Sequence, residues 1–402
     1  MRRTTAALVL ACAAAPARAD DWPHWRGPAR NGVSAETAWL DRWPAEGPKV
    51  LWKSHVGLGF SSFALAGGRV FTMGHADDRD TVLAFDLETG TILWKHSHAA
   101  ELNDRFYPGG TTGMPTVEGD RVYVLGRFGE VFALEAGTGK VVWSRNAAQE
   151  AGVRVPDWGF TGAPLVHEGL LILAMGEAGV ALEKLTGKLA WKSEDKASGY
   201  SSPLPVRRDG AWQILVSSGS SHLAVDPKTG KEIWRIRWVT QYGVNAADPV
   251  VDGDRIFFSS GYGKGAAVFA LGDGEPSPVW TNKSMRNQMN PCVLVDGHLY
   301  GADGDEDKKP QLKCLEFATG REKWARDGLG ACGVSAAGGR LLVLSEGGEL
   351  IVAPASPERF APVARAKVLE GRCWTAPVLS NGRVLCRNGA GDVVCLDLRR
   401  NP

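Results

Sequence analysis

Short runs of apolar or alternating residues recur along the whole chain, with turn sequences between them. Residues 121–125, 170–174, 255–258 and 340–344 are examples. Runs of four or five residues with this pattern are typical of half-buried or fully buried β-strands. No segment beyond the N-terminus has the period of an amphipathic helix, so the pattern predicts an all-β protein.

One hairpin motif repeats along the chain. From Ala84 to Trp94 it has an apolar strand, an Asp-x-x-Thr-Gly turn and a second strand that ends in Trp. The Gly of such a turn can take a positive φ without steric cost. Successive motif tryptophans are 43 to 49 positions apart, and a period in the forties is typical of propeller blades or another repeat array. Degenerate copies end at Trp143, Trp191, Trp234 and Trp324, and a weaker copy ends at Trp280.

The two ends of the chain each carry half of the motif. Residues 49–53, with Trp52, are a second strand without a first, and residues 393–398 are a first strand without a second. Pairing them would close a ring and leave no open sheet edge. Third strands near residues 84, 133, 181, 224, 269, 315, 351 and 395 predict an eight-bladed β-propeller of four-stranded antiparallel blades. The seventh blade lacks the Thr-Gly turn and the Trp.

Composition agrees with this fold and narrows the partners. The chain has 402 residues with 50 Gly and 15 Trp, and stacked repeats share one core, so we expect one domain. A net charge of +1 gives no reason to expect nucleic acid or an anionic membrane as partner. No later stretch is long and apolar enough to span a bilayer, and we expect a monomer. The expected segments are a signal peptide (1–19), a Trp/Pro/Gly-rich lead-in (20–48) and the propeller (49–398).

The N-terminus has the pattern of a signal peptide. Arg2 and Arg3 precede a mostly apolar stretch, and Ala17-Arg-Ala19 is a cleavage site before Asp20. We therefore expect export to the periplasm or the outside. A twin-arginine signal and lipid anchoring at Cys12 remain alternatives, which we favour less because two threonines follow the arginines and Cys12 would leave a short apolar segment.

Six cysteines follow the signal peptide, all in the last third of the chain. An oxidising compartment would permit disulfides. Cys386 and Cys395 flank a predicted hairpin and are the candidate pair. The alternative is that they are small buried thiols on neighbouring strands.

The motif Ala-x-Asp-x-x-Thr-Gly-x-x-x-Trp resembles the repeat of the pyrroloquinoline-quinone (PQQ)-like family, whose members are eight-bladed propellers. The resemblance covers roughly residues 50–398, and the lead-in from Trp22 to Ser34 resembles the start of exported bacterial proteins of this type. In the family, the Trp strand is outermost and its indole docks beside the Gly of the next repeat. The resemblance implies this blade-docking role for Trp52, Trp94, Trp143, Trp191, Trp234, Trp280 and Trp324.

The resemblance leaves two classes of function. Some members are quinoprotein dehydrogenases that use PQQ and Ca²⁺, and others are scaffolds such as BamB of outer-membrane protein assembly. A quinoprotein would carry adjacent cysteines, Glu and Asn ligands to Ca²⁺ and an Asp base; this chain has no adjacent cysteines and no segment matching those ligands. We expect a BamB-like, non-catalytic binding or assembly scaffold without a cofactor. A PQQ-dependent alcohol or sugar dehydrogenase with a divergent site is the alternative.

Loops between blades supply the candidate site. They are rich in aromatic and polar residues and should converge on a central funnel, where they could bind a protein or a small polar ligand. The alternative is that they only plug the channel. The candidates are Arg105, Tyr107, Trp158, Tyr242, Arg286, Asn290 and Trp374.

Two clusters suggest a metal site. Asp303, Asp305 and Asp307 have the spacing with which a loop can wrap a hard cation, but no downstream Glu completes the set and two lysines follow, so a solvated hairpin tip is the alternative. His96 and His98 lack a third ligand, and we take them as surface loop residues.

The cleavage site generates the first prediction. Protein recovered from exporting cells should begin at Asp20, as read by N-terminal sequencing and intact mass. A chain that begins at an acylated Cys12 would instead establish lipid anchoring, and an uncleaved chain would contradict both forms of export.

Overall fold

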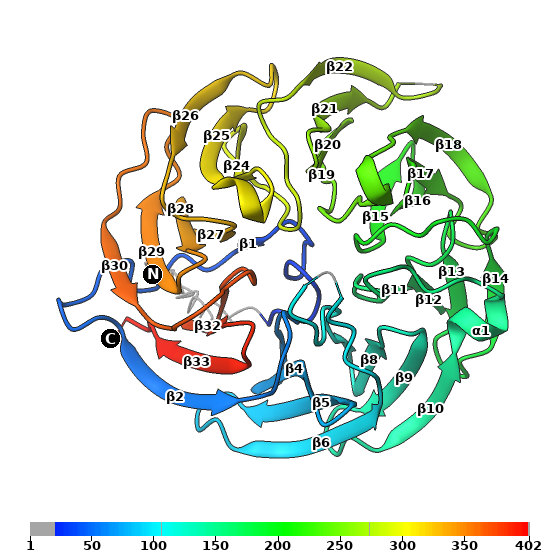
Figure 1. Cartoon of the computed structure of the whole chain (residues 1–402), viewed down its shortest axis with the longest axis horizontal. Helices are drawn as coiled ribbons and strands as arrows, with labels where there is room; N and C mark the ends of the chain where they lie inside the picture. The colour runs from blue at the N-terminus through cyan, green and yellow to red at the C-terminus, as the bar shows by residue number, and fades with distance from the viewer. Residues whose placement is uncertain (1–20, 106, 273, 401–402) are drawn as a thin grey trace, which may run out of the picture.

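The computed structural model describes residues 21–105, 107–272 and 274–400. The proposed signal peptide and Cys12 lie outside these residues. Eight blades, each with four antiparallel strands, are arranged around one axis as a ring (Figure 1). The structure therefore confirms the all-β, eight-bladed propeller.

Each blade runs from an inner to an outer strand. The first four blades contain β3 (Ala64–Ala66), β4 (Arg69–Ala76), β5 (Arg79–Asp86) and β6 (Ile92–Ala99); β7 (Thr116–Glu118), β8 (Arg121–Leu125), β9 (Glu130–Glu135) and β10 (Val141–Asn146); β11 (Leu165–His167), β12 (Leu170–Leu173), β13 (Val180–Glu183) and β14 (Leu189–Lys192); and β15 (Leu204–Arg208), β16 (Ala211–Ser217), β17 (Ser221–Val225) and β18 (Glu232–Arg237).

The remaining blades complete the ring. They contain β19 (Val250–Asp252), β20 (Arg255–Ser260), β21 (Gly265–Ala270) and β22 (Ser277–Asn282); β23 (Val293–Val295), β24 (His298–Asp303), β25 (Gln311–Glu316) and β26 (Glu322–Arg326); β27 (Gly333–Ala337), β28 (Arg340–Leu344), β29 (Glu349–Pro354) and β30 (Ala364–Lys367); and β31 (Val378–Ser380), β32 (Arg383–Arg387), β33 (Asp392–Asp397) and β2 (Lys49–His55).

The last blade is built from both ends of the chain. β2 is antiparallel to β33, from Lys49 opposite Asp397 to His55 opposite Asp392, and the two strands lie side by side in Figure 1 as blue and red arrows. This pairing confirms the predicted closure of the ring by the terminal strands.

A few short elements depart from the repeat. In the lead-in, β1 (Val33–Ser34) pairs in parallel with β27. A short helix, α1 (Ala147–Ala151), follows β10, and η1 (Gln241–Gly243) and η2 (Glu306–Lys308) are single 3₁₀ turns. In the part of the chain that the structure describes, no helix has the length and apolar character needed to cross a membrane.

The cysteine pair predicted as a disulfide is not formed. Cys386 lies opposite Val394 and Cys395 lies opposite Leu385, so the two side chains point to opposite faces of the sheet because successive residues of a strand alternate. Both are buried free thiols in different core clusters. Burial raises the pKa of Cys395 to about 12, and the structure agrees with the alternative of buried thiols on neighbouring strands.

The motif tryptophans join consecutive blades. In six of the seven, the indole N–H donates to a backbone carbonyl in the turn of the following blade, at 2.9 or 3.0 Å. The acceptors are the carbonyl groups of Leu87, Ala136, Lys184, Pro227, Phe317 and Ser356 for Trp52, Trp94, Trp143, Trp191, Trp280 and Trp324, respectively. Because the rings are largely buried, each joint combines apolar burial with a satisfied polar group.

The Thr-Gly turn is shaped to receive this ring. Asp86 Oδ1 accepts hydrogen bonds from the backbone N–H of Thr89 (2.8 Å) and from its hydroxyl (2.9 Å). Gly90 follows with φ +69°, and a Cβ there would lie 2.5 Å from the Trp52 ring. The glycine is therefore required twice, by its backbone conformation and by the indole that covers it.

Trp234 departs from this rule. Its N–H donates to Gln213 Oε1 of its own blade at 3.0 Å. The next blade has no Asp-x-x-Thr-Gly turn, and the longer sequence 271–276 stands in its place.

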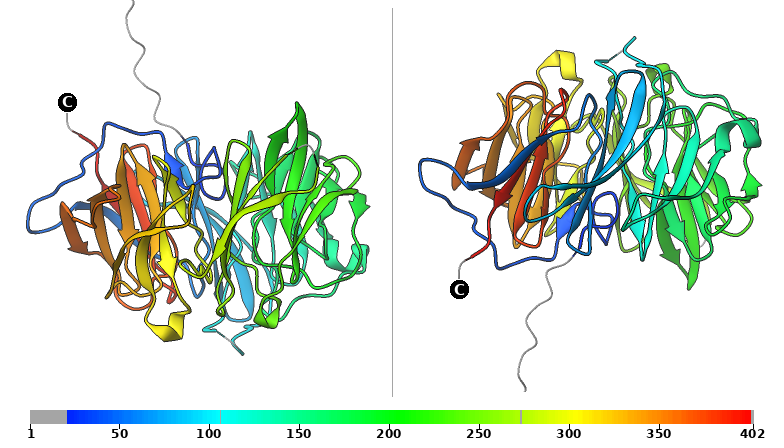
Figure 2. Two further views of the ribbon diagram at one scale, coloured as in Figure 1. Left: turned by 90° about the horizontal axis from the view of Figure 1, so that it is seen from above. Right: turned by 90° about the horizontal axis from the view of Figure 1, so that it is seen from below.

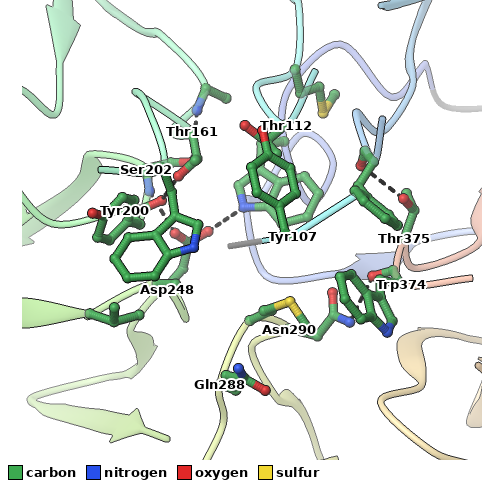
Figure 3. A pocket seen from close by; sticks show the side chains of 18 of the residues that line it. Tyr107, Thr112, Thr161, Tyr200, Ser202, Asp248, Gln288, Asn290, Trp374 and Thr375 are labelled. Atoms are coloured by element: carbon green, nitrogen blue, oxygen red, sulfur yellow. Dashed lines mark hydrogen bonds between the residues drawn. The ribbon is translucent and has the colours of Figure 1, made fainter. Parts of the chain in front are cut away.

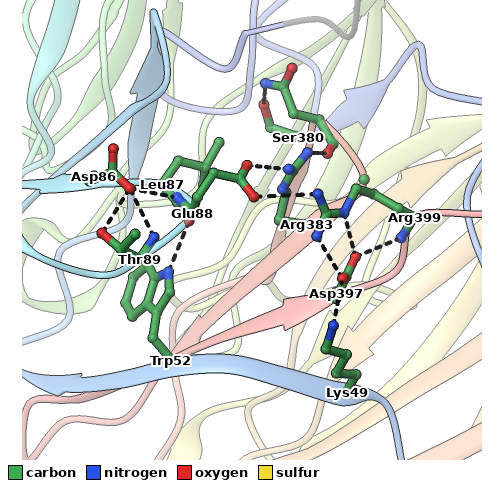
Figure 4. Close-up of polar contacts among 12 residues, drawn as sticks. Lys49, Trp52, Asp86, Leu87, Glu88, Thr89, Ser380, Arg383, Asp397 and Arg399 are labelled. Carbon is green, nitrogen blue, oxygen red and sulfur yellow. Dashed lines mark hydrogen bonds and ion pairs between the residues drawn. The ribbon is translucent and has the colours of Figure 1, made fainter.

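Surface charges add a second tie where the ring closes (Figure 4). Glu88, in the turn of the first blade, pairs with Arg383 and with Arg399 (3.3 Å) of the last blade. Asp397 pairs with Arg399 at 2.7 Å and with Lys49 at 3.7 Å. Exposed pairs of this kind contribute little each, so closure depends mainly on the β2–β33 ladder and on Trp52.

Three glycine-to-alanine variants separate the two requirements at the turn. Gly139→Ala would place a methyl 2.5 Å from the Trp94 ring at φ +71° and should cost about 2–4 kcal/mol of unfolding free energy. Gly152→Ala has a similar φ of +69° with nothing within 4 Å, so it should cost only about 1 kcal/mol. Gly137→Ala, also in open space, should be nearly neutral. Urea denaturation measures all three, and equal losses at Gly139 and Gly152 would contradict the docking argument.

Candidate functional site

A pocket of about 230 Å³ opens at the centre of the ring. Its described lining residues come from the lead-in, from two loops between second and third strands, and from all blade junctions except that between β26 and β27. Figure 3 shows these side chains directed toward a common space. The loops thus bring residues from most of the chain to one place.

The lead-in closes one end of this space. Trp22 pairs with Leu65 of β3 through backbone hydrogen bonds of 2.9 Å in both directions. Arg26 donates to the carbonyl of Cys292 at 2.5 Å, across the ring. Seen from the side, the dark-blue lead-in lies toward one face, and the yellow turn that contains η2 projects from the other (Figure 2). The lead-in therefore converts a central channel into a pocket with a floor.

Asp248 holds this floor to the wall. One carboxylate oxygen accepts from Trp25 Nε1, and the other accepts from the backbone N–H of Ser202 at 2.7 Å. Burial raises the pKa of Asp248, while the positive charges of Arg26 and Arg30 and the hydrogen bonds oppose this rise. Burial also lowers the pKa of Arg30 to about 10, against the attraction of Asp248. Asp248 is thus a structural group, because both of its carboxylate oxygens hold the lead-in to the wall.

Aromatic rings form much of the wall. Phe60 stacks on Trp374 with ring centroids 4.8 Å apart, and Asn290 donates to the carbonyl of Trp374 at 2.8 Å. On another side, Trp158 meets Tyr200 edge to face at 5.6 Å. These contacts fix the rings in place, so the wall is preformed.

Most polar groups of the wall already have partners. The Thr161 hydroxyl donates to the carbonyl of Tyr200 at 2.5 Å. Ser202 Oγ accepts from the N–H of Ala163 at 3.0 Å. Such pairing lowers the cost of placing these groups in an apolar setting.

Two polar groups of the wall are exceptions. Thr112 Oγ1 and Glu306 Oε2 are buried and have no hydrogen-bond partner among the described residues. Glu306 belongs to η2, where its backbone N–H donates to Gln288 Oε1 at 2.7 Å. The loop that carries the carboxylate is therefore held while the carboxylate oxygen itself is left unsatisfied.

The structure brings together four of the seven candidate residues from the sequence. Three others lie outside the described lining. Arg286 is paired with Asp303 at 2.8 Å through two nitrogens. Tyr242 is 67% exposed and packs edge to face on Tyr262, and Arg105 is exposed. The four that line the pocket are Tyr107, Trp158, Asn290 and Trp374.

The acidic cluster does not form a metal site. Asp303 is held by Arg286 and Lys313 (2.9 Å), and Asp305 by Lys308 (2.9 Å). Asp307 is exposed on η2, and no set of three His, Cys, Asp or Glu residues converges within the described ranges. Asp303 and Asp305 are directed to separate cations, so the three carboxylates of the predicted metal site, Asp303, Asp305 and Asp307, do not converge in this structure.

The two histidines also differ from the expectation. His96 and His98 lie on β6 rather than in a loop. Both rings pack on Phe132, with ring centroids 4.7 and 4.8 Å from the Phe132 centroid. Burial lowers the pKa of His98 to about 4. They are packing residues of the outer strand.

Several pocket residues have no distinctive signal in the sequence. Trp25 stands in the Trp-rich lead-in, whose composition indicates only a strap. Asp248 has no motif around it, and Glu306 stands in the acidic run 303–307, whose spacing suggests a cation loop rather than a pocket wall. Their importance comes from their place in the ring, which sequence spacing does not report. Trp25 and Asp248, for example, are 223 positions apart.

Fold and pocket together define an eight-bladed propeller of PQQ-like repeats with a floor formed by its own N-terminal segment. The family described as outer membrane protein assembly factor BamB matches residues 78–326. This is more than half of the chain, and the protein belongs to that family. A search of curated proteins finds no match.

Solved structures of similar fold include a BamB and several alcohol dehydrogenases. BamB from Moraxella catarrhalis has a TM-score of 0.66 at 14% identity and covers 87% of this chain and 100% of its own. The quinohemoprotein alcohol dehydrogenase from Comamonas testosteroni has a TM-score of 0.69 at 16% identity, and the match covers 95% of this chain and 81% of the dehydrogenase. A europium-containing methanol dehydrogenase has a TM-score of 0.69 at 13% identity, and the match covers 93% of this chain and 90% of the dehydrogenase. At these identities the likeness shows the fold alone.

The floor generates a test. Asp248→Asn would put an amide N–H against one of two donors, Trp25 Nε1 or the Ser202 N–H. It would also remove the negative charge that attracts the buried Arg26 guanidinium. We expect a loss of about 2–4 kcal/mol of unfolding free energy, measured by urea denaturation. Asp254→Asn, in an exposed turn, is the control and should be neutral; equal effects would mean that the floor contact contributes nothing.

Proposed function

We propose that this protein is a non-catalytic binding propeller that holds a small ligand, or a projecting group of a partner protein, in its central pocket. The observation that carries this proposal is the pocket itself: aromatic rings fixed by mutual packing, with hydrogen-bonding groups that are mostly paired with one another. Such a surface suits recognition by shape and by a few placed polar groups.

The chemistry of the wall supports binding rather than catalysis. Among the described residues that line the pocket, none is His, Cys, Lys or Arg. The hydroxyls of Thr161 and Ser202 contact backbone groups, so neither is paired with a base that could activate it. The Asp248 carboxylate is engaged by two donors.

The alternative is a quinoprotein dehydrogenase, a class to which some of the similar structures belong by name. PQQ is a tricarboxylate, and an anion of this kind needs cationic partners or a bound metal when it is buried. The described lining has no Lys or Arg, and the arginine and lysine side chains around η2 are already paired with Asp303 and Asp305. Within the described residues, no three His, Cys, Asp or Glu side chains converge to hold a metal. The residues present therefore do not fit the cofactor.

We also propose that the protein acts after export, in the cell envelope or outside it. The support is the N-terminal pattern from Arg2 to Ala19 and membership of a family described by an outer-membrane assembly factor. A monomeric propeller with one pocket at its centre is suited to one partner or ligand at a time.

Reconstitution tests the proposal. Purified protein dialysed against PQQ and Ca²⁺ should retain no quinone absorbance and should show no alcohol- or sugar-dependent reduction of a dye. Retention of one PQQ per chain with turnover would replace the binding proposal by the dehydrogenase. The Asp307→Asn and Glu306→Gln variants would then tell whether turnover depends on the pocket, since only Glu306 lines it.

A further inference from the structure

We propose that the ligand of the central pocket is a small organic cation, an ammonium ion carried on a compact apolar body, and that Glu306 is its counter-charge. This inference rests on the proposed binding function and adds the chemical class of the ligand. Nothing in the family match or in the similar structures assigns it.

The unsatisfied carboxylate is the first observation. Glu306 Oε2 is buried, has no hydrogen-bond partner, and Glu306 forms no ion pair among the described residues. The cations of its neighbourhood are already used, Lys308 by Asp305 and Arg286 by Asp303. Glu306 as a whole is half-buried, but a carboxylate oxygen that is shielded from water without a partner is costly, and a bound cation would offset that cost.

The loop that carries Glu306 is held firmly in place. Its backbone N–H donates to Gln288 Oε1 at 2.7 Å, and Gln288 Nε2 donates to the Tyr262 hydroxyl at 3.2 Å. One residue earlier, Asp305 Oδ1 accepts from the backbone N–H of Tyr262 at 2.6 Å. These bonds fix η2 against the neighbouring blade, so the carboxylate remains at the pocket without a local cation.

The aromatic wall is the second observation. The face of an aromatic ring is electronegative and attracts cations, most strongly when water is excluded, and aromatic cages of this kind recognise quaternary ammonium groups. The protein already uses this contact beside the pocket, where the Arg372 guanidinium lies 4.7 Å from the Trp374 ring centroid. Rings that line the pocket and are not covered in this way include Trp25, Tyr107 and Tyr262.

The balance of charge is the third observation. No described lining residue is Lys or Arg, and the one other carboxylate of that lining, Asp248, has both of its oxygens engaged by hydrogen bonds from Trp25 and Ser202. Glu306 is therefore the charge that remains. A carboxylate or phosphate ligand would meet repulsion from it, whereas a cation is attracted both by Glu306 and by the rings. A volume of about 230 Å³ limits the ligand to a small molecule.

A pair of matched probes isolates the charge. Choline and 3,3-dimethyl-1-butanol have the same shape and the same hydroxyl, and they differ in a quaternary nitrogen in place of a carbon. Isothermal titration of the full mature chain should show choline binding about tenfold tighter than the alcohol. Equal affinity for the two probes, or no binding of choline, would overturn the proposal.

A pair of matched variants locates the counter-charge. Glu306→Gln should reduce choline affinity about fivefold or more and leave the affinity for the alcohol unchanged. Asp307→Asn removes the same charge one residue further along η2, where the side chain is exposed and does not line the pocket, and should have little effect. Equal losses in both variants would mean that only the general surface potential acts, which would refute the role of Glu306.

Two further measurements keep the outcomes distinct. Without ligand, Glu306→Gln should melt at the same or a higher temperature than the parent protein because it removes a charge that has no partner; a lower melting temperature would contradict the unsatisfied carboxylate.

Glucose, a neutral polyol, should not bind. Binding of glucose but not choline would sink the cation class and leave the binding propeller standing, whereas PQQ retention with turnover would sink the proposed function itself.

Discussion

The whole ring depends on one repeated joint, in which an indole lies on the glycine of the next blade and donates its N–H to a carbonyl of the same turn. The glycine must lack a side chain because the ring occupies that space, as at Gly139 under Trp94. The Asp and Thr side chains that precede the glycine hold the turn in this conformation. Each joint therefore couples the local conformation of one hairpin to the packing of the neighbouring blade. A single blade alone would expose both its indole and its glycine turn to solvent.

This division explains how much of the molecule could be predicted. The architecture follows from the motif because the same local chemistry is used at nearly every joint, so even degenerate copies are recognisable. The half-motifs at residues 49–53 and 393–398 likewise indicate that the ends must pair. Where a motif is absent, as after Trp234, the sequence indicates a missing turn but not the substitute acceptor, Gln213.

The pocket follows different rules, and the sequence indicates only part of it. Aromatic loop residues such as Tyr107 and Trp158 can be found because large rings in junction loops are unusual. Asp248 and Glu306 cannot, because their significance lies in having, or lacking, partners from distant blades. The Cys386–Cys395 prediction was wrong for a related reason: loop length indicates which strands are neighbours, but the register decides which face each side chain takes.

Closure of the ring by β2 and β33 also has a consequence for the order in which the molecule can form. During synthesis β2 is made before the other blades, yet its partner β33 is made only after all of them. Until then β2 has an unpaired edge, and the floor around Trp25 lacks the opposite wall of the pocket. Contacts between residues so far apart in sequence form slowly. The nascent chain must therefore carry an incomplete blade while the blades between β2 and β33 are made, and a polypeptide that ends before β33 has neither a closed ring nor a finished pocket.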